Sequence, residues 1–234
     1  TKSAINENVD GSREPLKVLI RDIKIFDEQD NPNASNPKLS KEHCLTHFPK
    51  DPQCDICNRF RIRKRDCRRA HREAGSKHQW IEPEAVGDLL TADTKIVAER
   101  DIDAQSVDYD RVALVILDYF TRYLAAYPAP SKNSDEVYDA FRQFLGLKAT
   151  PKAIYSDNAG EITSAVKSLG GLPVTCTPHI PATNGAAENA VRKVTEGTGC
   201  SLGQSGFSHQ WWNAAMRCYT FLRNVSDIQH FGTT

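Results

Sequence analysis

The sequence has no apolar run long enough to cross a membrane, and no signal peptide opens it. Its seven cysteines are irregularly scattered, which argues against the disulfide framework of a small secreted protein and favours a reducing compartment. It also has no net charge, since 30 Lys and Arg residues balance 30 Asp and Glu residues. The overall charge therefore gives no indication of a nucleic-acid partner. We expect no membrane partner, and a chain of 234 residues that buries one substantial core plus a smaller module.

The positive charge is concentrated in one stretch. Eight of the fourteen residues from 59 to 72 are basic, against the single acid Asp66. Most charge runs are solvated helix faces, but almost no acids are available here for i,i+4 pairing, so self-repulsion would oppose a helix. The stretch therefore predicts sequence-independent, salt-sensitive contacts with the DNA backbone. The predicted contacts are Arg59, Arg61, Arg63, Lys64, Arg65, Arg68 and Arg69, with Arg72 ending the run.

Just before the basic stretch, four residues of the metal-ligand type occur within fifteen positions. His43 and His47 stand at i, i+4, which would place both imidazoles on one side of a helical turn, and Cys54 and Cys57 form a CxxC knuckle. Together they predict a closed tetrahedral zinc site, which can hold a segment that has little core of its own. The alternative is a loop with two unrelated histidines and a chance CxxC. The possible substitute ligands are Cys44, Cys67 and His71.

Three acidic residues indicate a second kind of metal site. Asp93 interrupts an apolar strand pattern, where an ionised carboxylate is unfavourable unless a cation neutralises it. Asp157 closes a short apolar run before a turn, and Glu188 opens a helical pattern after Asn184-Gly185. Carboxylates that converge from two strands and a helix suit hard cations such as magnesium or manganese. Two such ions can serve phosphoryl transfer. Arg192 and Lys193, beside Glu188, are predicted to hold DNA there.

Four other acids have simpler interpretations. Asp118 is predicted to be a turn residue at a hairpin corner, and Glu161 the first-turn acid of a short helix. Glu196 is a fallback for Glu188, although it lies two turns further along the helix. Glu188 and Arg192 are also correctly spaced for a plain i,i+4 ion pair.

Periodicity predicts a mixed α/β chain. The expected elements are a strand over 87–97, strands in RVALVILDYF and RYLAAYPA, a helix capped by Ser134, a strand ending at Asp157, a helix that stops at Gly170-Gly171, a strand in PVTCT, a short helix carrying Glu188, and a helix capped by Ser208. The last helix is expected to bury Trp212, Ala215, Tyr219 and Leu222. The expected divisions are a largely disordered linker at 1–38, a zinc-binding and basic segment at 39–80, a catalytic core at 86–225 and a linker at 226–234.

The order Asp93, Asp157, Glu188, with YSDNAGEIT around the second acid and PATNGAAENAVRK around the third, resembles the D,D,E catalytic core of retroviral and Copia-type LTR-retrotransposon integrases. DYFTRYLAAYPAPSKNSDEVYDAFRQF resembles the hairpin and helix of the same core. The resemblance covers about residues 86–225, and the four predicted zinc ligands fall in the order of the HHCC module that precedes such cores. It implies a ribonuclease-H-like fold, a mixed five-stranded sheet flanked by helices.

The function implied by this resemblance is metal-dependent 3′-end processing and strand transfer of DNA by a piece of a retrotransposon polyprotein. It further implies Mg²⁺ or Mn²⁺ at the three acids, structural Zn²⁺ at the HHCC-like motif, double-stranded DNA as partner, a homo-multimer on DNA, and location in the nucleus or a virus-like particle. Thirty residues separate Asp157 from Glu188, fewer than the family usually leaves. Two alternatives follow, a decayed or domesticated core that only binds DNA, and a ribonuclease-H-type nuclease.

Overall fold

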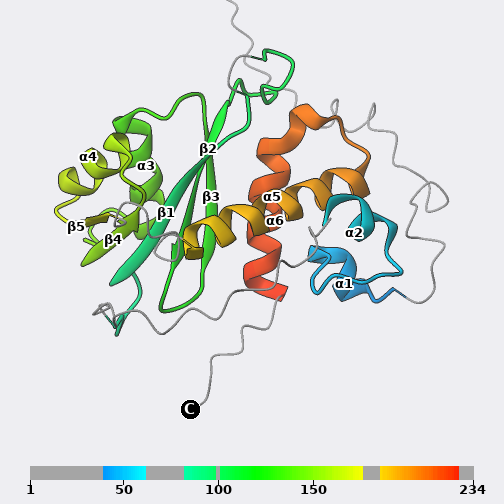
Figure 1. Ribbon diagram of the computed structural model, residues 1–234, viewed down its shortest axis with the longest axis horizontal. Helices are drawn as coiled ribbons and strands as arrows, with labels where there is room; N and C mark the ends of the chain where they lie inside the picture. The colour runs from blue at the N-terminus through cyan, green and yellow to red at the C-terminus, as the bar shows by residue number, and fades with distance from the viewer. Residues whose placement is uncertain (1–38, 62–81, 99–100, 176–184, 227–234) are drawn as a thin grey trace, which may run out of the picture.

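The computed structural model describes residues 39–61, 82–98, 101–175 and 185–226 (Figure 1). Two short helices come first, α1 (Lys41–Thr46) and α2 (Asp55–Phe60). The remaining elements are β1 (Leu89–Ile96), β2 (Val112–Asp118), β3 (Leu124–Ala129), α3 (Ser134–Leu145), β4 (Ala153–Ser156), α4 (Gly160–Ser168), β5 (Leu172–Thr175), α5 (Gly185–Ser205), the 3₁₀ turn η3 (His209–Trp211) and α6 (Trp212–Ser226). The predicted linker at 1–38 lies outside the described ranges, and so does the predicted linker at 226–234 except for Ser226, which ends α6.

The five strands form one mixed sheet in the order β3-β2-β1-β4-β5. The first three strands pair antiparallel, with Asp93 of β1 opposite Val115 of β2, whereas β4 runs parallel to β1 and β5 runs parallel to β4. Every residue of β2 is buried, as the continuous apolar run predicted for an interior strand. Three antiparallel strands followed by two parallel strands, with helices on both faces, are the ribonuclease-H-like arrangement, and the predicted fold class is confirmed.

Alternation along β2 assigns its side chains to two hydrophobic layers. Leu114 and Ile116 pack with α3 and α4 on one face of the sheet. Val115 and Leu117 pack with Ala190 of α5 and with α6 on the other face. Figure 1 shows α5 and α6 on the opposite side of the sheet from α3 and α4. Because Asp93 is paired with Val115, its side chain belongs to the face covered by α5, the helix that carries Glu188.

Three local expectations need correction. Asn133, and not Ser134, caps α3, since its side-chain oxygen accepts from the backbone N–H of Glu136 at 2.9 Å. Helix α6 buries Trp212 and Tyr219 as predicted, but Ala215 and Leu222 are only half-buried. The buried face also includes three polar residues. Asn213 donates to Asp110 in the loop before β2, Arg223 donates to the carbonyl of Arg122 in the turn between β2 and β3, and Thr220 donates to the carbonyl of Met216 within the helix.

Helix α5 is much longer than predicted, at 21 residues. Its second half contains Gly197, Gly199 and Gly203. Because glycine has a low helix propensity, these residues argued against a helix in this part of the sequence. The structure explains these glycines by close approach. A Cβ at Gly197 would lie 2.1 Å from the ring of Tyr219, and one at Gly203 would lie 2.2 Å from the ring of Phe60. The helix is therefore stabilised by tertiary packing, which overrides its weak propensity.

We expect Gly197→Ala to lower the free energy of unfolding by about 1–3 kcal/mol, because the added methyl group must displace the buried ring of Tyr219. Alanine's better helix propensity opposes this by less than the clash. Urea denaturation followed by circular dichroism measures the change. Gly185→Ala on the same helix is the matched control, since a Cβ there meets no described atom, and unchanged or higher stability is expected. Equal stability of the two variants would contradict the packing assigned to Gly197.

Candidate metal centres

The first centre is a cluster of two histidines and two cysteines built by α1 and α2. His43 lies in the last turn of α1, and His47 caps that helix in a left-handed conformation with φ 53°. Cys54 caps α2 at its N-terminus, and Cys57 follows one turn later. The four ligand atoms all lie within 4.8 Å of one another. The HHCC-like site predicted from spacing is therefore present in the structure.

The distances within this cluster identify the atoms that face a common centre. Cys54 Sγ lies 3.4 Å from His47 Nδ1, and Cys57 Sγ lies 3.4 Å from His43 Nε2 and 3.8 Å from His47 Nδ1. Two thiols and two imidazole nitrogens at this separation fit a tetrahedral zinc site. Of the predicted substitute ligands, Cys44 is a half-buried free cysteine outside this group, and Cys67 and His71 lie outside the described residues.

Burial sets the protonation of the cluster. Burial, together with the neighbouring thiols of Cys54 and Cys200, raises the pKa of Cys57 to about 11. Burial also lowers the pKa of His43 and His47. Without a cation the imidazoles are therefore neutral and Cys57 keeps its proton, so a bound metal would release thiol protons. Zinc binding at this cluster is expected to weaken as the pH falls.

The second centre contains the predicted acids at the carboxyl end of β4 and beside it. Ala92 of β1 is in register with Ser156 of β4, so the next residues, Asp93 and Asp157, are neighbours across the parallel pair. Both acids line a cavity of about 440 Å³, which Thr94, Ile96, Lys132, Asn158, Ala159 and Glu161 complete. Asp93 is half-buried and Asp157 is exposed. The crevice at the ends of adjacent strands is where α/β sheets hold ligands.

Glu188 approaches this centre from α5. It is exposed in the first turn of the helix, and α5 packs against β1 and β2. Burial raises the pKa of Asp93, and the charges of Asp157 and Glu188 raise it further. The three carboxylates therefore interact electrostatically, although within the described ranges they do not form as close a group as the His/Cys cluster. Mutual repulsion holds ionised carboxylates apart when no cation lies between them.

The other acids take structural roles. Asp118 is fully buried and accepts hydrogen bonds from the backbone N–H groups of Gly87 and Thr121, so its assignment as a corner residue is confirmed. Glu161 lies in the first turn of α4 as predicted, and its carboxylate is 3.5 Å from Lys132 Nζ. The carboxylate of Glu196 pairs with Arg61 and Arg192, which accounts for this acid by ion pairs within the protein.

Arg61 corrects the predicted DNA-contacting set. Its guanidinium is buried, donates to the carbonyl of Thr46 at 3.0 Å and lies 3.6 Å from Glu196. It therefore joins α1 and α5 inside the protein and is not presented to a phosphate backbone. The basic sequence context concealed this role, since no local pattern distinguishes Arg61 from the basic residues around it.

The remaining predicted DNA contacts fall into two groups. Arg59 and Arg192 are exposed, and Arg192 binds Glu196 at 3.1 Å and Asn189 at 2.7 Å, so its ion pair is not with Glu188. Lys193 is half-buried on the same helix. The rest of the basic stretch lies outside the described residues: Arg63, Lys64, Arg65, Arg68, Arg69 and Arg72.

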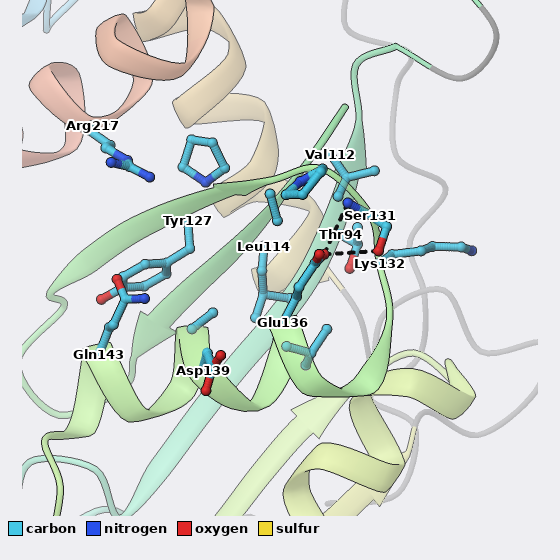
Figure 2. A pocket seen from close by; sticks show the side chains of 15 residues that line it. Thr94, Val112, Leu114, Tyr127, Ser131, Lys132, Glu136, Asp139, Gln143 and Arg217 are labelled. Carbon is cyan, nitrogen blue, oxygen red and sulfur yellow. Dashed lines mark hydrogen bonds between the residues drawn. The ribbon is translucent and has the colours of Figure 1, made fainter. Parts of the chain in front are cut away.

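A second cavity, of about 200 Å³, lies between the sheet and α3 on the face away from α5 (Figure 2). Thr94 and Lys132 border both this cavity and the one that holds Asp93 and Asp157. Figure 2 shows Arg217 at one side of it and Glu136 at the other, where Glu136 accepts from the backbone N–H and hydroxyl of Ser131, both at 3.0 Å. The sequence carried no signal for this cavity.

Comparison with curated proteins identifies homologues over half of the chain. The retrovirus-related Pol polyprotein from transposon RE2 of Arabidopsis thaliana is 29% identical over 127 residues, covering 51% of this chain and 9% of that protein. The corresponding polyprotein from transposon RE1 of the same plant is 29% identical over 125 residues, covering 51% of this chain and 8% of that protein. The chain thus spans less than a tenth of the curated relatives that it matches. No protein-family model matches it.

Among solved structures, the catalytic core domain of BIV integrase is similar, with 18% identity and a TM-score of 0.42 over 61% of this chain and 86% of that chain. Within the described residues, no helix has the length and apolar character needed to span a bilayer. The predicted resemblance to retrotransposon proteins is confirmed, because both polyprotein relatives are retrovirus-related and come from transposons.

Proposed function

We propose that this chain, a homologue of transposon Pol polyproteins, is the integrase region of such a polyprotein and catalyses metal-dependent 3′-end processing and strand transfer of DNA. The observation that carries the proposal is the position of Asp93. It lies on an interior strand, beside Asp157 in one cavity, on the sheet face covered by the helix of Glu188. The polyprotein relatives support the same function.

The donor chemistry of the three acids fits a hard divalent cation. All three offer carboxylate oxygens, and their mutual repulsion, which contributes to the raised pKa of Asp93, is what a divalent cation would relieve. We propose that Asp93, Asp157 and Glu188 hold two Mg²⁺ or Mn²⁺ ions. Bound there, such ions would activate the attacking water or 3′ hydroxyl and stabilise the leaving oxygen. Lys132, at the cavity rim, is placed to contact a phosphate.

The partners follow from the same proposal. The proposed ion at the His43, His47, Cys54 and Cys57 cluster is Zn²⁺ in a structural role. The proposed ligand is double-stranded DNA, with Arg59, Arg192 and Lys193 as the described candidates for backbone contacts. A homo-multimer on DNA, and a nuclear or virus-like-particle location, are proposed by analogy with the integrase family.

The test begins with calorimetric titration of Mn²⁺ into the zinc-loaded chain. Wild type is expected to bind Mn²⁺, and Asp157→Asn is expected to weaken binding by at least tenfold, since it removes one of three charged ligands. Glu161→Gln is the matched control, because this acid lines the same cavity but pairs with Lys132. Its Mn²⁺ affinity is expected to stay within a few-fold of wild type. Equal losses in both variants would contradict the assignment of Asp157.

Activity is then measured without knowing the element ends. A library of duplexes with recessed 3′ ends and random terminal sequences is incubated with supercoiled plasmid and Mn²⁺, and joined products are sequenced. Wild type is expected to join a subset of ends. Mn²⁺ binding and DNA binding without any joining would overturn the proposed activity and favour a core that only binds DNA.

A further inference from the structure

Both ring nitrogens of His47 have polar side-chain neighbours. Its Nδ1 faces the thiols of Cys54 and Cys57, at 3.4 and 3.8 Å. Its Nε2 lies 2.7 Å from the side-chain oxygen of Gln204, a residue 157 positions away in the sequence, near the end of α5. The partner of the ring therefore comes from the helix that also carries Glu188, and not from the small segment that contains the other ligands.

The geometry fixes the tautomer of this imidazole. The oxygen of the Gln204 amide is an acceptor, so Nε2 must carry the hydrogen of the neutral ring. Nδ1 is then left with its lone pair, which is directed at the two thiols. A histidine bound to a metal through one nitrogen commonly donates from the other, and the outer partner fixes the orientation of the ring and increases its basicity.

We propose that Gln204 is a positioning residue of the zinc site, so that α5 completes a metal centre whose four ligands lie on α1 and α2. This inference rests on the proposed zinc site and is independent of the role assigned to Asp93, Asp157 and Glu188.

Two further contacts hold α5 against the ligand segment at the correct distance. Phe60, at the end of α2, lies against Gly199 and Gly203 of α5, where any side chain would collide with its ring. Arg61 joins the carbonyl of Thr46 to Glu196 of α5. Gln204 thus contacts His47 from a helix whose separation from α1 and α2 is fixed by packing. Because Gln204 is already in place, its side chain does not have to be ordered when a metal binds.

The experiment measures metal binding by the full chain, through competition between the protein and a chromophoric chelator for Zn²⁺. Gln204→Leu keeps the size of the side chain and removes the acceptor, and it is expected to weaken zinc binding by about 10- to 100-fold. Gln204→Glu keeps an acceptor oxygen at the same position and is expected to restore wild-type affinity or exceed it. Gln143→Leu, an exposed glutamine on α3, is the matched control and should bind zinc like wild type.

The second readout is the absorption spectrum of the Co²⁺-loaded protein, which reports the geometry at the metal. Gln204→Leu is expected to alter the visible bands while Gln204→Glu preserves them, a distinction that loss of packing alone would not produce. Zinc affinity of Gln204→Leu equal to wild type, or equal losses in both Gln204 variants, would overturn the inference. Absence of zinc binding in wild type would instead overturn the proposed zinc site itself.

Discussion

Replacement of Asp93 by asparagine is expected to lower DNA joining by on the order of a thousandfold and, at the same time, to stabilise the metal-free protein. The loss of joining follows because Asp93 is the proposed metal ligand on an interior strand, and metal-ion catalysis contributes several kcal/mol to transition-state stabilisation, at about 1.4 kcal/mol for each factor of ten. The gain in stability follows because Asp93 is partly buried and is repelled by the charges of Asp157 and Glu188 when no cation lies between the three carboxylates.

The sign of the stability change is set by the direction of the pKa shift. Burial, followed by the charges of Asp157 and Glu188, raises the pKa of Asp93 above its ordinary value of 3.8. Folding therefore disfavours the ionised form, and the penalty is absent below pH 3.8, grows as the pH rises through the raised pKa, and is complete at neutral pH. Asparagine carries no charge, so Asp93→Asn should be more stable than wild type near pH 7 and no more stable in strong acid.

Thermal melts with and without Mn²⁺ separate these effects. Wild type is expected to gain about 2.7 kcal/mol when Mn²⁺ is a hundredfold above its Kd, whereas Asp93→Asn should gain much less. Asp139→Asn, an exposed acid on α3, is the control and should follow wild type in all conditions. The prediction is refuted if Asp93→Asn joins DNA at the wild-type rate, or if it is less stable than wild type without metal.

Sequence reasoning succeeded where the signal was local in the chain. The buried run of β2, the strand predicted to end at Asp157 and the His/Cys spacing of the metal-ligand cluster each follow from neighbouring residues. Each is present in the structure, although β4 ends one residue earlier than predicted, at Ser156. The pairing of β1 with β2 and β4, which makes Asp93 and Asp157 neighbours, is a long-range fact. It was available only through the resemblance to a known family of cores, because periodicity alone reaches a mixed α/β chain.

The features that sequence reasoning missed depend on contacts distant in the chain. Arg61 was grouped with its basic neighbours, but its buried guanidinium donates to the carbonyl of Thr46 and pairs with Glu196, so it joins α1 to α5. The second half of α5 was not predicted, since glycines are unfavourable in helices unless other elements must come close. Gln204 had no local signal at all, because its partner His47 is 157 positions away. These three features all lie where α1 and α2 meet α5.

That junction makes the four proposed zinc ligands important for the stability of the described core. Cys57→Ser is expected to abolish zinc binding and to lower the free energy of unfolding in zinc buffer by about 4 kcal/mol, the contribution of an ion present at a thousand times its Kd. Cys57 is fully buried, and α2 packs against α5 in the described structure, so loss of the ion should loosen the support of that helix as well as α1 and α2. Excess chelator should bring wild type down to the stability of the variant.

Urea denaturation in zinc buffer and in chelator measures this effect. Cys218→Ser is the matched control, since Cys218 is an exposed thiol on α6 outside the ligand cluster, and its stability should equal that of wild type in both buffers. In zinc buffer, α1, α2 and α5 are expected to unfold together in a single cooperative transition, because Phe60 and Arg61 join them. If chelator left the wild-type transition unchanged, the cluster would hold no structural ion, and apolar packing of Phe60 on α5 would be what supports the helix.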